Sequence, residues 1–207
     1  MVLGRTMRTL AIECATEACS VALFDDRALL AGDFRVLGRG HAEHLVPMIG
    51  ALPDRGKAQR ILVSLGPGSF TGIRIGIAVA GSLAIAWGAE VKGYPTLSLV
   101  AAMAAPTGPV TVSMAGGHGE WFVQDFASDG RPSSELASLV PEAAASRGAL
   151  QTIAGSRSSE LAALLSEPHE VIDGLPDARQ VTRLAPDLYS DTIAPVYGRG
   201  PDARLPA

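Results

Sequence analysis

A glycine-rich segment holds the residues whose types and spacing could most readily do chemistry. It comprises Gly66, Pro67, Gly68, Ser69, Phe70, Thr71, Gly72 and Arg74. Free backbone N–H groups and the positive end of a following helix would make such a loop a site for an anion. The same residues also suit a tight turn with a helix cap, since Gly66 and Gly68 permit unusual backbone angles and Ser69 or Thr71 can cap. The segment lacks the lysine of a P-loop, which excludes that motif.

Two histidines form a second candidate. His41 and His44 stand at positions i and i+3, which places both imidazoles on one face of a helix and suits two metal ligands. No third ligand is evident nearby, and the His-Glu-x-x-His pattern of zinc proteases is absent. The alternative is a polar or interface face of the helix, and we predict no metal and no other cofactor.

The other reactive side chains of the first half lack the partners that catalysis needs. Thr16 and Ser20 could act as nucleophiles, but no histidine and aspartate accompany them at a recognisable spacing. Glu13 is interpreted as a solvated carboxylate at a strand end. The spacing of Cys14 and Cys19 could just permit a disulfide, and small buried thiols are the alternative in a chain without a secretory segment. We therefore predict no catalytic residue.

The composition indicates a large aliphatic core and no basic surface block. The 207 residues are 47% hydrophobic, 18% charged and 5% aromatic, with a formal net charge of -4. Because phosphate neutralisation supplies most non-specific affinity, we expect no unaided binding to nucleic acid. No stretch reaches the roughly 18 uninterrupted apolar residues of a membrane span, although residues 71–87 come nearest. We expect a soluble, cytoplasmic protein with no membrane partner.

The elements that position these residues are clearest in the first hundred residues. Strands are predicted at 9–14, 20–24, 28–36 and 60–64, and helices at 41–52 and 71–88. Pro47 implies a kink in the first helix or a later start. The order of three strands, a helix, a strand and a helix is that of ribonuclease-H-like and actin-like ATPase lobes, and several other α/β folds share it.

The second half gives weaker signals. We predict a hairpin of 110–114 and 120–126 around the glycines at 116–119, a helix at 158–165, a brief strand at 171–172 and a helix at 176–188. Ser158 or Ser159 would cap the helix at 158–165. Residues 106–109 are interpreted as the link between two lobes.

Small residues recur every four positions along the predicted helix 71–88. They form a ridge of nearly bare backbone made of Gly72, Gly76, Ala80, Ala84 and Gly88. A bulky row beside it is made of Ile75, Val79, Leu83 and Trp87. Packing on the lobe's own sheet uses one of these rows. Because each glycine costs up to about 1 kcal/mol of helix propensity, we expect a close helix–helix contact within the chain or across an interface.

Four segments resemble the signature sequences of the TsaB (YeaZ) family. They are residues 12–23 (IECATEACSVAL), 41–49 (HAEHLVPMI) and 65–76 (LGPGSFTGIRIG), and the closing motif at 194–197 (APVY) followed by Arg199. The Gly-Pro-Gly-Ser-Phe-Thr-Gly string is highly specific. The first lobe matches over almost its whole length, and the second lobe matches in patches.

The resemblance implies an α/β protein of the actin-like ATPase (ribonuclease-H-like) fold, with two lobes of mixed sheets flanked by helices and a reduced second lobe. We expect a first lobe at 1–105 (βββαβα), a smaller second lobe at 106–190, and a C-terminal tail at 191–207 that returns to the first lobe.

The same resemblance implies a non-catalytic subunit needed to make threonylcarbamoyladenosine next to the anticodon of tRNA. In this family the metal and the transfer chemistry belong to the catalytic subunit TsaD, which the TsaB type activates by dimerising with it, and the ATPase TsaE joins the complex. Proteins of this type bind tRNA only through the complex, and in isolation they form homodimers through similar surfaces.

The helices of the first lobe form the heterodimer contact in that family. Carried over to the helices at 41–52 and 71–87, the resemblance predicts that the contact residues are His41, His44, Leu45, Met48, Gly72, Ile75, Gly76, Val79, Ala80, Leu83 and Trp87.

Two departures from the family pattern bear on this expectation. Glu13 and Cys14 replace the usual Asp-Thr at the end of the first strand, where an actin-like ATPase holds the aspartate that organises Mg²⁺. In the second lobe, Ala115, Gly116 and Gly117 replace an Asp-Ala-Arg stretch. The alternative function is an autonomous metal-dependent, glycoprotease-like hydrolase or a nucleotide-binding enzyme, which would need a metal on the histidines or ATP on the glycine-rich loop.

Overall fold

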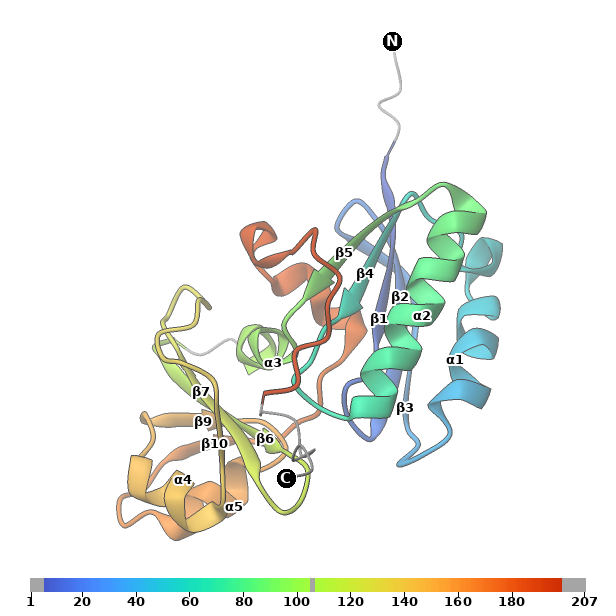
Figure 1. Ribbon diagram of the computed structural model, residues 1–207. Coiled ribbons are helices and arrows are strands. Elements are labelled where there is room, and N and C mark those ends of the chain that lie inside the picture. Colours follow the sequence, from blue (N-terminus) through green and yellow to red (C-terminus); the bar gives the residue numbers. More distant parts are fainter. Residues whose placement is uncertain (1–5, 105–106, 199–207) are drawn as a thin grey trace.

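The computed structural model describes residues 6–104 and 107–198, and it arranges them in five layers (Figure 1). Two five-stranded mixed sheets are each covered on both faces. Helices α1 and α2 cover the outer face of the first sheet, and α4 and α5 cover the outer face of the second. Helix α3 and a short 3-10 segment lie between the two sheets.

The first sheet has the strand order β3-β2-β1-β4-β5. Its strands are β1 (Arg8–Glu13), β2 (Ala18–Asp25), β3 (Ala28–Val36), β4 (Arg60–Ser64) and β5 (Glu90–Tyr94). Strand β1 is antiparallel to β2 and parallel to β4. The central strands are mostly apolar and buried along nearly their whole length because both faces of the sheet are covered. The predicted strands are confirmed, whereas β5 was missed because Glu90 and Lys92 break its apolar pattern at the sheet edge.

The two long helices of the first lobe run along the outer face of this sheet. Helix α1 (His41–Gly50) begins at His41 with Pro47 inside it, so the later start that the proline suggested is wrong. Helix α2 (Phe70–Trp87) is capped by Ser69, whose Oγ accepts from the Gly72 N–H at 3.2 Å. A short 3-10 turn, η1 (Pro53–Gly56), joins α1 to β4.

The second sheet repeats the topology of the first with the order β10-β9-β6-β7-β8. Its strands are β6 (Val110–Ala115), β7 (Trp121–Phe126), β8 (Ala137–Leu139), β9 (Thr152–Ala154) and β10 (Glu170–Ile172). The two helices are α4 (Pro141–Arg147) and α5 (Ser158–Leu164). The predicted hairpin, α5 and β10 are confirmed. Elements β8, α4 and β9 were missed because three to seven residues contain too few periods for a pattern.

The predicted cap of α5 is wrong. The helix starts after Arg157, which makes no side-chain cap bond. The hydroxyls of Ser158 and Ser159 instead donate to Asp173, at 2.6 and 2.5 Å. These bonds tie the start of α5 to the residue that follows β10.

The segment after β10 returns to the first sheet. The single helix predicted at 176–188 is replaced by two 3-10 turns, η2 (Ala178–Arg183) and η3 (Pro186–Leu188), because Pro186 cannot continue the helix. The turns pack against the inner face of the first sheet through Val181 and Leu184. Although the sequence analysis grouped these residues with the second lobe, their apolar contacts are with the first.

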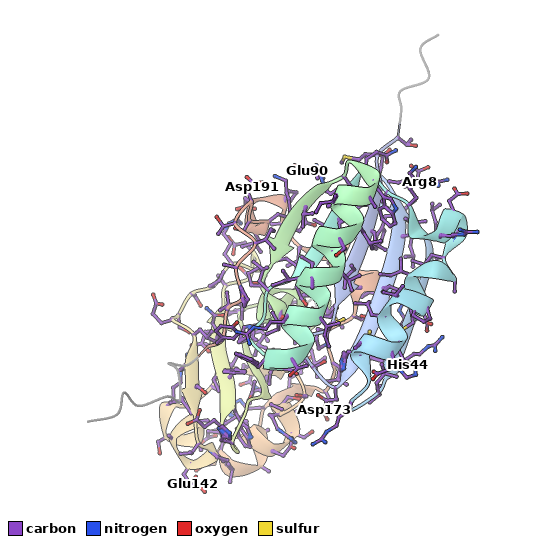
Figure 2. The ribbon with its side chains drawn as sticks, turned by 45° about the vertical axis from the view of Figure 1, so that its right-hand side comes forward. Arg8, His44, Glu90, Glu142, Asp173 and Asp191 are labelled. Carbon is purple, nitrogen blue, oxygen red and sulfur yellow. The ribbon has the colours of Figure 1, made fainter. Side chains whose placement is uncertain are left out.

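Residues 190–198, called the C-terminal strap below, continue along the edge of the first sheet. Ser190 pairs with Gly93 on β5 through two backbone bonds of 2.8 and 2.9 Å. Lys92 bridges Glu90 at 3.4 Å and Asp191 at 2.8 Å, and Figure 2 shows the two carboxylates at the same end of the lobe. The strap therefore covers the free edge of β5.

Helix α3 (Thr96–Ala104) joins the two lobes and was missed in the sequence. Leu97, Val100 and Ala101 pack into the core of the second sheet, while Leu99 packs against the first. It is apolar on all sides because both sheets bury it, so it shows no amphipathic period. Pro106, part of the predicted link, lies outside the described residues.

These observations confirm the predicted class. The protein is α/β, with two mixed sheets flanked by helices in the actin-like (ribonuclease-H-like) arrangement and shorter elements in the second sheet.

Candidate functional site

The glycine-rich loop packs directly against the turn between β1 and β2. The Gly66–Pro67 peptide is cis, and Gly66 and Gly68 have positive φ values of 94° and 159°. A Cβ added at Gly68 would overlap the carbonyl of Ala15, and one added at Gly72 would overlap the carbonyl of Cys14. The glycines are therefore needed because two backbone segments meet here without room for a side chain.

Two of the loop N–H groups that an anion could use donate within the chain. The Ser69 N–H donates to the Ala15 carbonyl at 2.7 Å. The Gly72 N–H donates to Ser69 Oγ at 3.2 Å. This geometry favours the interpretation of the segment as a tight turn and helix cap over the interpretation as a phosphate site.

Glu13 is enclosed rather than solvated, so that prediction is wrong. Its side chain is fully buried, and Oε1 accepts from the Ala15 N–H at 2.7 Å. Among the described residues, Oε2 has no hydrogen-bond partner. Burial raises the pKa of Glu13 to about 7, against the smaller opposing effect of the Ala15 hydrogen bond. A carboxyl in this state is poorly suited to hold a divalent cation.

The two cysteines are free thiols and face one another. Both are buried, and their Sγ atoms lie 3.6 Å apart. The contact between the two thiols raises the pKa of Cys14 and lowers that of Cys19. The pair fills the core between the first sheet and α2, beside Gly76. The alternative of small buried thiols is therefore confirmed.

The two histidines have separate structural roles. His41 is buried, and its Nε2 lies 2.9 Å from the Thr16 carbonyl and 3.2 Å from the Ala18 carbonyl, so this nitrogen is the donor. His44 is exposed, with Nδ1 2.9 Å from the Gly40 carbonyl at the start of α1 (Figure 2). Within residues 6–104 and 107–198 no three His, Cys, Asp or Glu side chains form a group that could hold a metal ion.

Most of the predicted contact residues face the protein's own core. The buried ones are His41, Leu45, Met48, Gly72, Gly76 and Ala80. The half-buried ones that pack against that core are Ile75, Val79, Leu83 and Trp87. Of the set, His44 alone is exposed. The small-residue ridge thus serves close packing inside the chain, because α2 crosses the ends of β1 and β4 at the distance that glycine allows.

The outward face of α2 is the apolar surface that the sequence analysis missed. Its residues, called the outer stripe below, are Phe70, Arg74, Ala78, Ser82 and Ile85, and all are exposed. Ile85 is 88% exposed and Phe70 is 54% exposed. The Ser82 hydroxyl donates to the Ala78 carbonyl at 2.8 Å, so it presents little free polarity. The sequence contained a pattern that could have identified this face, because these residues follow helical spacing on the side opposite the ridge.

This surface gives α2 an unusual composition for an exposed helix. It is the one helix of the described residues that is long and apolar enough to cross a membrane, with a mean hydropathy of 1.5 and 22% of its residues buried. Its glycine ridge packs on a sheet whose core is complete, so α2 is a helix of the globular fold with an apolar face left uncovered. Contiguous exposed apolar surface of this kind marks interaction sites.

Three side chains from two distant segments stack at the start of the outer stripe. The rings of Phe70 and Tyr197 lie 5.1 Å apart between centroids. The Arg74 guanidinium carbon lies 3.4 Å from the Phe70 centroid and 5.4 Å from that of Tyr197. The strap holds Tyr197 here because the Val196 N–H donates to the Leu65 carbonyl at 2.7 Å. The glycine-rich segment and the closing motif were both recognised in the sequence, but the contact between them was not predicted. Arg199 of the closing motif lies outside the described residues.

Comparison with known sequences identifies related proteins. A protein from Escherichia coli named "tRNA threonylcarbamoyladenosine biosynthesis protein TsaB" is 42% identical over 100 residues, covering 46% of this chain and 43% of that protein. The protein of the same name from Haemophilus influenzae is 34% identical over 102 residues, covering 47% and 42%. The chain thus spans less than half the length of these curated relatives.

Solved structures match over nearly the whole chain. The structure titled "YeaZ from Pseudomonas aeruginosa" superposes with a TM-score of 0.77 at 27% identity, covering 92% of this chain and 99% of that one. The family model described as "TsaD: tRNA N6-adenosine threonylcarbamoyltransferase" matches residues 35–167, more than half of the chain. With its two-sheet fold and glycine-rich loop, the chain therefore belongs to the TsaD family, among its TsaB (YeaZ) members.

Proposed function

We propose that this chain is the non-catalytic subunit required for threonylcarbamoyl transfer to the adenosine next to the anticodon of tRNA. It acts by dimerising with, and activating, a TsaD-like catalytic subunit. The observation that carries the proposal is the outer stripe of α2, an exposed apolar helix face on an otherwise complete core. The names of the related TsaB proteins support the pathway.

The state of the groups that could do chemistry supports an accessory role. The Ser69 and Gly72 N–H groups of the loop already donate within the chain, and the Glu13 carboxyl is enclosed with its pKa raised to about 7. His41 donates to two backbone carbonyls, so its Nε2 has no lone pair for a metal. These observations make the autonomous hydrolase or nucleotide-binding enzyme the weaker alternative.

The proposed partner face differs from the one expected from the sequence. It consists of the outer stripe together with Val46 on α1, which is 56% exposed. The buried residues among the predicted contacts are left out of this proposed face, since they pack in the core. A TsaE-like ATPase joins the complex in this proposal, the isolated chain can form a homodimer through the same face, and the complex resides in the cytoplasm. Because the chain has a net charge of -4, tRNA is bound through the complex.

The test is a matched pair of charge insertions on equivalent helices of the two lobes. Ile85→Arg places a cation in the outer stripe, and Leu164→Arg places one at a position that is 50% exposed on α5. Titration calorimetry with the purified TsaD-like protein of the same organism should show that Ile85→Arg weakens binding at least about tenfold, with Leu164→Arg unchanged. A strain depleted of the chain should regain modified adenosine with Leu164→Arg and not with Ile85→Arg. Wild-type chain that does not bind at micromolar concentration would overturn the proposal.

A further inference from the structure

Arg74 holds the one charge on the outer stripe. The 18 residues of α2 are otherwise uncharged. Within residues 6–104 and 107–198 no carboxylate lies within ion-pair distance of Arg74, whereas arginines elsewhere in the described residues, such as Arg60 and Arg147, are ion-paired. A lone cation on an apolar surface is the kind of group that fixes orientation and register when that surface is covered.

The guanidinium is held in place before any partner arrives. It stacks on the exposed ring of Phe70, and the Tyr197 ring lies beside both groups, 5.1 Å from the Phe70 centroid and 5.4 Å from the guanidinium carbon. Stacking restrains the long side chain and leaves the guanidinium N–H donors, which lie in the plane of the group, free at its edge. Such an arginine forms a bidentate bond to a carboxylate at a lower entropic cost than a free side chain would.

The strap makes this arrangement depend on the tertiary structure. The Val196 carbonyl lies against Gly66, where a Cβ would come within 2.5 Å of it. A Cβ at Gly198 would come within 2.6 Å of Phe122 in the second lobe. Tyr197 is thus positioned by contacts with both lobes, 123 residues after Arg74 in the chain.

We propose that Arg74, stacked on Phe70 and Tyr197, is the anchor that receives a carboxylate side chain of the TsaD-like partner when an apolar helix of that partner covers the outer stripe. This inference rests on the proposed function. A partner protein is favoured over a nucleic acid because the surroundings of Arg74 along α2 are apolar and the chain has no basic block that would neutralise further phosphates.

The experiment compares two substitutions that each remove one positive charge. Arg74→Met is the test, and Arg55→Met, at an exposed position in η1 beyond the C-terminal end of α1, is the matched control. Affinity for the purified TsaD-like protein is measured by calorimetry at several salt concentrations. Arg74→Met should bind about tenfold more weakly, and its affinity should depend less on salt, while Arg55→Met keeps both properties of the wild type. Thermal unfolding should be unchanged in both variants, because both side chains are exposed.

Two further variants identify the parts of the anchor. Arg74→Lys retains the charge without the planar fork and should recover only part of the affinity. Arg74→Glu should abolish binding, and a scan of acidic residues to arginine on the partner should find one change that restores it.

The outcomes separate this inference from the proposed function. Wild-type chain that fails to bind the TsaD-like protein contradicts the proposed function itself. Wild-type binding with an unchanged affinity and salt dependence in Arg74→Met overturns the anchor alone. The anchor is also overturned if Arg74→Met alters only self-association in the ultracentrifuge, or only the affinity of the assembled complex for tRNA.

Discussion

The two lobes share one topology and differ in what their helices leave exposed. Each sheet has a central strand antiparallel to the next strand in the chain and parallel to the strand after its first helix. The helix after that strand is α2 in the first lobe, with 18 residues, and α5 in the second, with 7. Since the second lobe keeps the strand order with three-residue strands, the order itself does not require long helices.

The lobes use glycine in the same way at the equivalent loop. Gly68 and Gly72, after β4, lie against carbonyls at the end of β1. Gly155, after β9, lies against the Ser113 carbonyl on β6 and has a φ of 113°. A strand–loop–helix junction that crosses the neighbouring strand end this closely needs glycine in both lobes.

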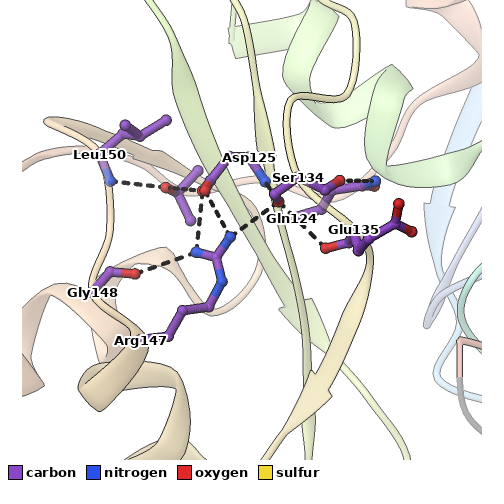
Figure 3. A network of polar contacts seen from close by, with 8 residues as sticks. Gln124, Asp125, Ser134, Glu135, Arg147, Gly148 and Leu150 are labelled. Carbon is purple, nitrogen blue, oxygen red and sulfur yellow. Dashed lines mark hydrogen bonds and ion pairs between the residues drawn. The ribbon is translucent and has the colours of Figure 1, made fainter.

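The second lobe relies on polar contacts where the first relies on apolar packing. Asp125 on β7 accepts from Arg147 at 2.6 and 3.2 Å and from Thr111 at 2.7 Å (Figure 3). Arg147 also donates to Ser134 at 3.0 Å, and the Leu150 N–H donates to Thr111. The network joins the ends of α4 and β7, so polar bonds rather than a long apolar helix hold this part of the second lobe together. This difference is the reason why the proposed partner face lies on the lobe with the long helix.

The largest effect on stability is expected at the close approach in the first lobe. Gly72→Ala would force a Cβ into the Cys14 carbonyl and should lower the free energy of unfolding by about 3 kcal/mol. The control is Gly81→Ala in the same helix, where a Cβ meets nothing within 4 Å. Because alanine has the higher helix propensity, this change should raise the free energy of unfolding by up to about 1 kcal/mol. Urea unfolding measures both, and equal effects would contradict the packing role of the ridge.

The next effect concerns pH and the buried carboxyl of Glu13 at the end of β1. The equivalent strand of the second lobe, β6, ends in Met114 and Ala115 and has no carboxyl there. Burial raises the pKa of Glu13 to about 7 in the folded chain, above the ordinary 4.5. The folded state therefore holds a proton that the unfolded state has lost, and stability falls as the pH rises from 4.5 through about 7. Glu13→Gln should gain about 2 kcal/mol at pH 8.5 and much less at pH 5.

Chemical unfolding at the two pH values checks this prediction. Glu17→Gln is the control, because Glu17 is exposed. A gain from Glu13→Gln that is the same at both pH values would mean that the charge of the carboxyl is not the cause.

The smallest effect is expected in the second lobe. Arg147→Met removes the bidentate bond to Asp125 and should cost about 1.5 kcal/mol. Arg157→Met removes an exposed pair with Glu160 three residues along α5 and should cost about 0.3 kcal/mol. Hydrogen exchange should show faster opening of β7, β8 and α4 in Arg147→Met, while α1 and α2 keep their protection. Opening that spreads to the first sheet would show that the two lobes do not behave as separate cooperative units.

The first lobe was predictable because its elements are long and apolar in a regular pattern. Strands β1 to β4 and helices α1 and α2 contain enough periods, and the glycine-rich segment marks where α2 begins. Element β5 was missed because its edge position admits charges, and α3 because burial on all sides removes its periodicity. The sequence indicated which helices carry the proposed partner face. It did not show which row of α2 is exposed, since the ridge and the outer stripe both follow helical spacing.

By itself, the sequence determined the fold class, the family and the position of the helix that carries the proposed partner face. These follow from local periodicity and from the specific glycine-rich string. Only the tertiary structure decided which side of α2 is free, because that depends on where β1 and β4 end and how closely glycine lets the helix approach them. It also decided that Tyr197 stacks near Arg74, since a contact between residues so far apart in the chain is set by the path of the strap.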